Sequence, residues 1–81
     1  MGYKPIPRKK FIKWLKKIGL EYKRTEGGHE IWDYPNTSEK KILRPVIFRT
    51  TEKDIPGCHI HTNLFTLEIS YKEFEKQIQR I

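Results

Sequence analysis

Cysteine is almost absent from the 81-residue sequence, and long apolar runs are missing. The single cysteine, Cys58, has no partner for a disulfide within the chain. No N-terminal stretch has the apolar core of a signal peptide, and no segment has the length of a membrane span. We therefore expect a cytoplasmic protein without a membrane partner.

Acidic residues are missing from the first 20 positions, which contain seven lysines and arginines. This segment accounts for the whole formal net charge of +7, because the rest of the chain has ten basic and ten acidic residues. Positive charge gathered on one segment is typical of proteins that bind polyanions, since neutralised phosphates release counterions. Nucleic acid is the leading candidate partner, and a merely solvated basic surface is the alternative.

The composition favours one small folded unit. Hydrophobic residues make up 36% of the chain and charged residues 33%, and the aromatic content of 12% is too high for a disordered tail. Internal repeats, low-complexity segments and interdomain linkers are not evident. We expect a single domain over residues 1–81 with a compact core.

An amphipathic helix is predicted over residues 7–19. Apolar residues recur there with helical spacing, Pro7 suits the first turn and Gly19 suits the stop. The apolar positions are Phe11, Trp14, Leu15 and Ile18. Three lysines repeat along another face, and we call them the basic ridge: Lys9, Lys13 and Lys16, with Lys10 and Lys17 beside them.

Strands are predicted over residues 20–26, 29–35 and 41–50. Only Gly27 and Gly28 separate the first two, which predicts a hairpin with a type I′ turn, because both central residues of that turn need positive φ. Pro45 cannot donate to a ladder, so the third strand belongs at a sheet edge. The pattern leaves open whether Ile31 or Trp32 faces the helices.

Two further helices complete the predicted order. Ile60, Leu64 and Leu67 have helical spacing within residues 58–68, and Ser70 with Glu73 matches a capping box before a short third helix. The fold class is therefore α+β, with the order α-β-β-β-α(-α). Its three-stranded antiparallel sheet has helices packed on one face and solvent on the other.

Several of these segments together resemble the HicA family of toxins. The resemblance rests on LKKIG at the end of the first helix, EGGHEIWDYP in the hairpin, and IPG followed by a helix and SYKEF. It extends from about residue 7 to about residue 75. It implies a fold like the double-stranded-RNA-binding domain, mRNA interferase activity, and control by a HicB-like antitoxin.

The family marker centres on a histidine. His29, Trp32 and Pro35 match its positions, whereas Gly28 stands where the family usually has a hydroxyl residue. Near the second helix, Gly57 lies one position earlier than the usual glycine, and Asn63 occupies a normally apolar site. By this resemblance His29 is the catalytic residue.

Histidine suits RNA cleavage because its neutral imidazole accepts a proton at physiological pH. His29 would take the proton of a 2′-OH as that oxygen attacks the adjacent phosphorus, giving a 2′,3′-cyclic phosphate and a 5′-OH without a metal or cofactor. Gly27 and Gly28 would let backbone N–H groups approach the phosphate. The candidate RNA-binding side chains are Lys9, Lys10, Lys13, Lys16, Lys17, Lys23 and Arg24. The general acid is not identified.

Other residues keep two interpretations. Arg44 and Arg49 extend the phosphate-contacting surface or only solvate the sheet. Aromatic side chains in the strands stack on unpaired bases or serve the core, and these are Tyr22, Trp32 and Tyr34.

The segment CHIH, residues 58–61, lacks the two separated ligand pairs of a structural zinc site. In one interpretation His59 and His61 are exposed at a helix start and Cys58 is half-buried. In the other, one of these imidazoles is the general acid beside His29. For the whole chain, the alternative to a nuclease is a non-catalytic RNA-binding module with the same fold.

Overall fold

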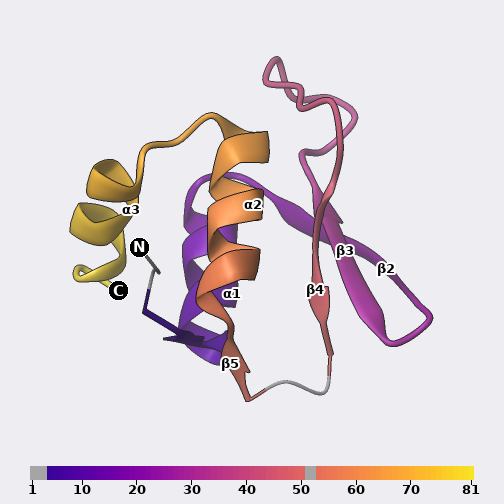
Figure 1. The fold of residues 1–81 in the computed structure, drawn as a ribbon. Coiled ribbons are helices and arrows are strands. Elements are labelled where there is room, and N and C mark those ends of the chain that lie inside the picture. Colours follow the sequence, from indigo (N-terminus) through magenta and orange to yellow (C-terminus); the bar gives the residue numbers. More distant parts are fainter. Residues whose placement is uncertain (1–3, 51–52) are drawn as a thin grey trace.

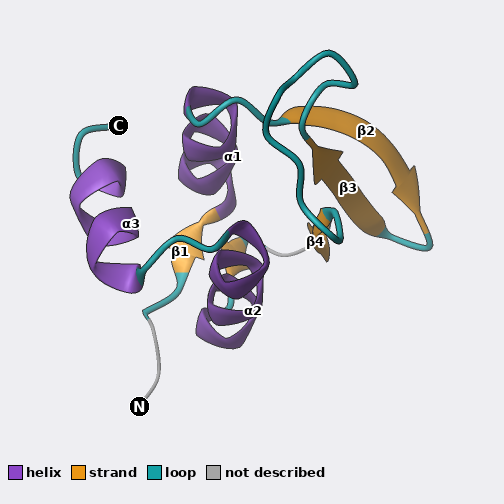
Figure 2. Ribbon diagram, turned by 90° about the horizontal axis from the view of Figure 1, so that it is seen from above, coloured by secondary structure: helices purple, strands orange, loops and turns teal. Residues whose placement is uncertain are grey.

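The computed structural model describes residues 4–50 and 53–81, and the chain has an α+β fold (Figure 1). Seen from above, the three helices lie on one side of the three-stranded sheet (Figure 2). In chain order the elements are β1 (Ile6–Pro7), α1 (Arg8–Lys17), β2 (Glu21–Glu26), β3 (His29–Asp33), β4 (Val46–Arg49), β5 (Asp54–Ile55), α2 (Gly57–Leu67) and α3 (Tyr71–Ile78).

Helix α1 confirms the predicted amphipathic helix. Phe11, Trp14 and Leu15 are fully buried. After α1 the chain turns at Gly19, whose φ is 106°, and the amide of the next residue, Leu20, donates to the carbonyl of Leu15. This is a Schellman ending, in which glycine adopts the left-handed conformation at little steric cost. The helix therefore stops where the sequence predicts.

The hairpin of β2 and β3 has the predicted turn. Gly27 and Gly28 have φ values of 56° and 78°, as a type I′ turn requires. Glu26 pairs with His29 immediately beside the turn, and an irregularity in the register lies between Tyr22 and Arg24 on β2. The sheet order is β2-β3-β4, so β4 is an edge strand as expected.

Strand β4 is shorter than predicted, and the prediction of a strand over 41–50 is wrong at its N-terminal half. Strand β3 also ends early, at Asp33 rather than at residue 35. Since Trp32 pairs with Val46, an extension of β4 would align Pro45 with Asp33 and then run beside Pro35. The pairing therefore stops where the extended segments would contain proline on both sides.

The core lies between the helices and one face of the sheet. Trp32, Val46 and Phe48 supply the sheet side of this cluster. Phe11 of α1 meets Phe48 edge-on with 5.5 Å between ring centroids. This resolves the question left open by the sequence, because Trp32 faces the helices. Ile31 pairs with Ile47 on the opposite face.

A small second sheet was not predicted from the sequence. Ile6 pairs with Ile55, and Pro7 pairs with Asp54, joining β1 to β5. Each strand has only two residues, too few to show a periodic pattern. The pairing brings the starts of α1 and α2 to the same end of the molecule (Figure 1).

The last helix, α3, begins as the capping box predicts. The Ser70 hydroxyl accepts a 3.1 Å hydrogen bond from the Glu73 amide, and Phe74 and Ile78 are buried in the core. The indole of Trp14 donates to Gln77 at 2.8 Å and ties α3 to α1. Among the described residues, no helix combines the length and apolar character needed to span a bilayer.

Candidate active site at the hairpin corner

His29 is the first residue of β3 and its side chain is half-buried. Its Nδ1 lies 3.2 Å from the carbonyl oxygen of Gly27. A carbonyl oxygen only accepts, so in this contact Nδ1 carries the proton. In the neutral ring that arrangement leaves the lone pair on Nε2, which can then accept a proton from a ligand. No hydrogen bond from Nε2 is found within residues 4–50 and 53–81.

The two turn glycines leave the space around this corner open. Among the described residues, no atom lies within 4 Å of a Cβ atom built on Gly27 or Gly28. The corner is also fixed, because the carbonyl of Gly28 accepts from the Thr50 amide at 2.9 Å and from the Thr50 hydroxyl at 3.1 Å. Sequence reasoning did not single out Thr50. We call the segment Gly27–His29 the hairpin corner.

The register of the sheet defines a face that points away from the helices, which we call the open face. Since side chains alternate along a strand, His29 and Ile31 share this face, whereas Glu30 and Trp32 point toward the helices. Beside His29 stand Glu26 on β2 and Arg49 on β4. The sheet therefore brings an imidazole, a carboxylate and a guanidinium to one edge of the open face.

Arg24 also stands on the open face, opposite Ile31. Its Nε donates to a Glu26 carboxylate oxygen at 2.8 Å. Both side chains are more than half exposed, so this ion pair is screened by water and contributes little to stability. Lys23, at the irregularity in β2, forms a 2.7 Å ion pair with Glu21.

On the helix side, Glu30 is a buried carboxylate with only 5% exposure. It forms an ion pair with Arg8 at the start of α1, and it accepts a 3.2 Å hydrogen bond from the Trp32 indole. Sequence reasoning missed this cluster. The only signal for it in the sequence is the alternation of side chains along β3. Glu30 shares a face with Trp32, and Trp32 was a candidate core residue.

The basic ridge of α1 does not share a face with His29. Lys9, Lys13 and Lys16 are exposed and lie on the side of the helix opposite its buried residues. Helix α1 itself packs on the other side of the sheet from the open face (Figure 2). Lys10 and Lys17 flank the ridge. An RNA strand that reaches both surfaces must therefore pass around the sheet.

The CHIH segment lies at the start of α2. His61 is exposed as expected, but the prediction is wrong for the other two residues, because Cys58 is exposed and His59 is half-buried. The Nδ1 atom of His59 is buried with no hydrogen-bond partner among the described residues. No group of three potential ligand residues is placed to hold a metal ion within the described ranges. Helix α2 packs beside β4, so that strand lies between these histidines and β3. Neither histidine is therefore an immediate neighbour of His29.

The three aromatic residues that could stack on bases differ in their exposure. Trp32 is 3% exposed and belongs to the core. Tyr22 is 50% exposed, and its hydroxyl lies 2.5 Å from that of Thr25. Tyr34 is half-buried, and burial raises the pKa of its phenol, with a smaller contribution from the Asp33 carboxylate. Of these three, Tyr22 is the most accessible to a nucleic-acid base.

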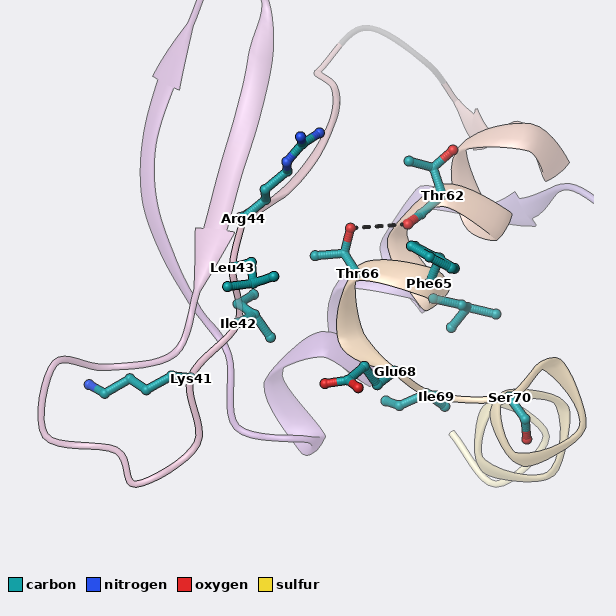
Figure 3. A pocket seen from close by; sticks show the side chains of 11 residues that line it. Lys41, Ile42, Leu43, Arg44, Thr62, Phe65, Thr66, Glu68, Ile69 and Ser70 are labelled. Carbon is teal, nitrogen blue, oxygen red and sulfur yellow. Dashed lines mark hydrogen bonds between the residues drawn. The ribbon is translucent and has the colours of Figure 1, made fainter.

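An apolar groove runs between the segment 41–44 and α2 (Figure 3). Leu43 is fully exposed and Phe65 is 81% exposed at its sides. Lys41, Arg44 and Glu68 supply charges around it. This groove lies before β4, whereas Arg49 and its partner His29 lie at the other end of that strand. It is therefore separate from the hairpin corner.

Comparisons with protein-family models, with curated proteins and with solved structures find no match to this chain. The features that bear on function are therefore the residues of the hairpin corner, the charge of the chain and the sequence resemblance.

Proposed function

We propose that this protein is a metal-independent endoribonuclease, acting as the RNA-cleaving toxin of a toxin–antitoxin pair of the HicA type. The proposal depends on one observation, the hydrogen bond from Nδ1 of His29 to the Gly27 carbonyl. It leaves Nε2 as the acceptor on an open, rigid corner. A general base needs this combination of a defined tautomer and access to the reacting group.

In the reaction, the lone pair on Nε2 of His29 takes the proton of a ribose 2′-OH. The 2′-oxygen forms a bond to the adjacent phosphorus as the bond from phosphorus to the 5′-oxygen breaks. The 5′-oxygen leaves with a proton from solvent water, and the imidazolium returns its proton to solvent. The products are a 2′,3′-cyclic phosphate and a 5′-OH. RNA supplies the nucleophile, so DNA is not a substrate.

The charge of the chain supports a polyanionic substrate. The net charge is +7, and the exposed lysines of α1 supply part of a surface that can follow a phosphate backbone. The resemblance to HicA toxins supports messenger RNA as the substrate and a HicB-like antitoxin as the protein partner. An acidic partner would complement the positive charge of this chain.

The test is cleavage of a single-stranded RNA by purified protein in EDTA. His29→Ala is expected to lower the rate by about 10²- to 10⁴-fold, the contribution typical of general acid–base catalysis. Its thermal midpoint should stay close to that of the native protein, because the ring is half-buried and outside the core cluster. Expression of the native chain, but not of His29→Ala, should arrest growth.

His61→Ala is the matched control, since His61 is an exposed histidine on α2. It should cleave at the native rate. If the native protein binds RNA but leaves it intact, the nuclease assignment is wrong. If His29→Ala cleaves as fast as His61→Ala does, His29 is not the general base.

One observation favours a second function, that of a non-catalytic RNA-binding module. The basic ridge and His29 lie on different sides of the sheet, so the ridge can hold RNA without bringing it to the imidazole. In that case His29→Ala leaves RNA affinity unchanged, no cyclic phosphate forms, and lysine substitutions on α1 alone weaken binding.

A further inference from the structure

We infer that Arg49 is the cation that holds the reacting phosphate beside His29. This rests on the proposed ribonuclease function and adds a second catalytic residue to it. Two aspects of the fold support the inference, the hydrogen-bonding register of β3 with β4 and the placement of the other cations.

Two hydrogen-bond patterns show which residue pairs of β3 and β4 exchange backbone hydrogen bonds. The side-chain amide of Asn63 on α2 accepts from the Ile47 amide at 3.4 Å and donates to the Ile47 carbonyl at 3.2 Å. The backbone groups of Ile47 therefore point away from β3, so Ile31 and Ile47 form a pair without mutual hydrogen bonds. Independently, the Thr50 amide donates to the Gly28 carbonyl at 2.9 Å.

Pair types alternate along an antiparallel ladder. His29 and Arg49 lie one step from the bonded pair of Gly28 and Thr50, and two steps from Ile31 and Ile47. Both patterns assign them to a pair without mutual hydrogen bonds. In such pairs the Cα atoms are only about 4.5 Å apart, and the two side chains project from the same face at their closest spacing.

Arg49 is thus the basic residue whose backbone stands closest to His29 on the open face. Arg24 is opposite Ile31 rather than His29. The basic ridge lies on the helix side of the sheet. The Arg49 backbone is also well fixed, because the next residue, Thr50, bonds the Gly28 carbonyl through its amide and its hydroxyl.

The chemistry needs a cation at this point. When the 2′-oxygen attacks, negative charge builds on the non-bridging oxygens of the phosphate. A guanidinium donates two parallel hydrogen bonds to such oxygens and keeps its proton throughout. Arg49 therefore stabilises the developing charge while His29 accepts the 2′-OH proton. Arg49 transfers no proton, so its loss should lower kcat more than it raises KM.

The experiment compares Arg49→Met with Arg80→Met on one single-stranded oligoribonucleotide in EDTA, measured under single-turnover and steady-state conditions. Arg49→Met should lower kcat by about 10²- to 10³-fold, as removal of one charge-stabilising donor does in other enzymes. Arg80→Met removes the same charge from an exposed position just after α3 and should change kcat by less than about threefold.

Arg49→Lys is a second test of the same residue. It is needed if Arg49→Met fails to fold, which thermal unfolding detects. Lysine keeps the charge but loses the two-pronged geometry, so kcat should still fall about tenfold or more. A native kcat in a folded Arg49 variant would overturn the inference, as would equal losses in the Arg80 and Arg49 variants. Either result leaves the nuclease function standing if His29→Ala is inactive. Absence of cleavage by the native protein instead rejects the nuclease function itself.

Discussion

Neighbouring residues of β3, His29 and Glu30, have opposite surroundings. Glu30 points into the helix side, where it is 5% exposed and bound by Arg8 and Trp32. His29 points to the open face, half-buried, with its Nδ1 held by the Gly27 carbonyl. Both side chains are titratable, but the protein encloses one and leaves the other accessible.

The difference separates stability from chemistry along a single strand. A buried ion pair loses its hydration, so removal of one partner leaves an uncompensated charge. A half-exposed imidazole on a rigid turn contributes little to the core. Substitutions on the helix side should therefore change the free energy of unfolding, and substitutions on the open face should change activity.

Arg8→Met tests the helix side and has the largest expected effect on stability. It leaves the Glu30 carboxylate buried without its cation, which should lower the free energy of unfolding by about 3–5 kcal/mol. Glu30→Gln should cost less, because the amide oxygen still accepts from the Trp32 indole. Urea unfolding followed by Trp fluorescence measures both. A larger loss in Glu30→Gln than in Arg8→Met contradicts this account.

Asn63→Leu should have the next largest effect. Asn63 is 4% exposed and satisfies both backbone groups of Ile47 at the edge of β4. Leucine leaves those groups without their partners, at a cost of about 1–3 kcal/mol. Thr62→Ala is the control on the exposed side of α2, expected within about 0.5 kcal/mol of native. Equal stability of the two variants would mean that Asn63 does not anchor α2 to β4.

Neutralising the basic ridge should have the smallest effect on stability. Lys9→Gln with Lys13→Gln should change the free energy of unfolding by less than about 0.5 kcal/mol, because both side chains are exposed. If the ridge contacts single-stranded RNA, the logarithmic salt slope of binding falls by about 0.7 per lost phosphate contact. Lys72→Gln on α3 is the control. An unchanged slope places the RNA on the open face alone.

Much of the fold could be predicted because its signals are local. The spacing of Phe11, Trp14 and Leu15 marks the buried stripe of α1, and Gly19 marks its end. The Gly27 and Gly28 pair predicts the turn, since few other residues tolerate positive φ at both positions. His29 was placed at the hairpin corner for the same reason, and its catalytic role remains a prediction.

The remaining features depend on contacts between residues distant in the sequence. Pairing of β1 with β5 joins Ile6 to Ile55, and two-residue strands leave no periodic trace. The partners of Glu30 and Asn63 come from other elements, α1 and β4 respectively. Strand β4 begins only at Val46, which pairs with the last part of β3. The residues of the segment 41–50 do not show where β3 ends.

The sequence alone determined the helices, the hairpin and the excess of positive charge, because spacing, glycine and charge act within a few residues. Only the tertiary structure decided which charged groups meet. It enclosed Glu30 with Arg8 and set Arg49 beside His29, while the basic ridge of α1 was directed elsewhere. Side-chain alternation makes a one-residue shift in register exchange the two faces of a strand, so these neighbours are fixed only when the strands have paired.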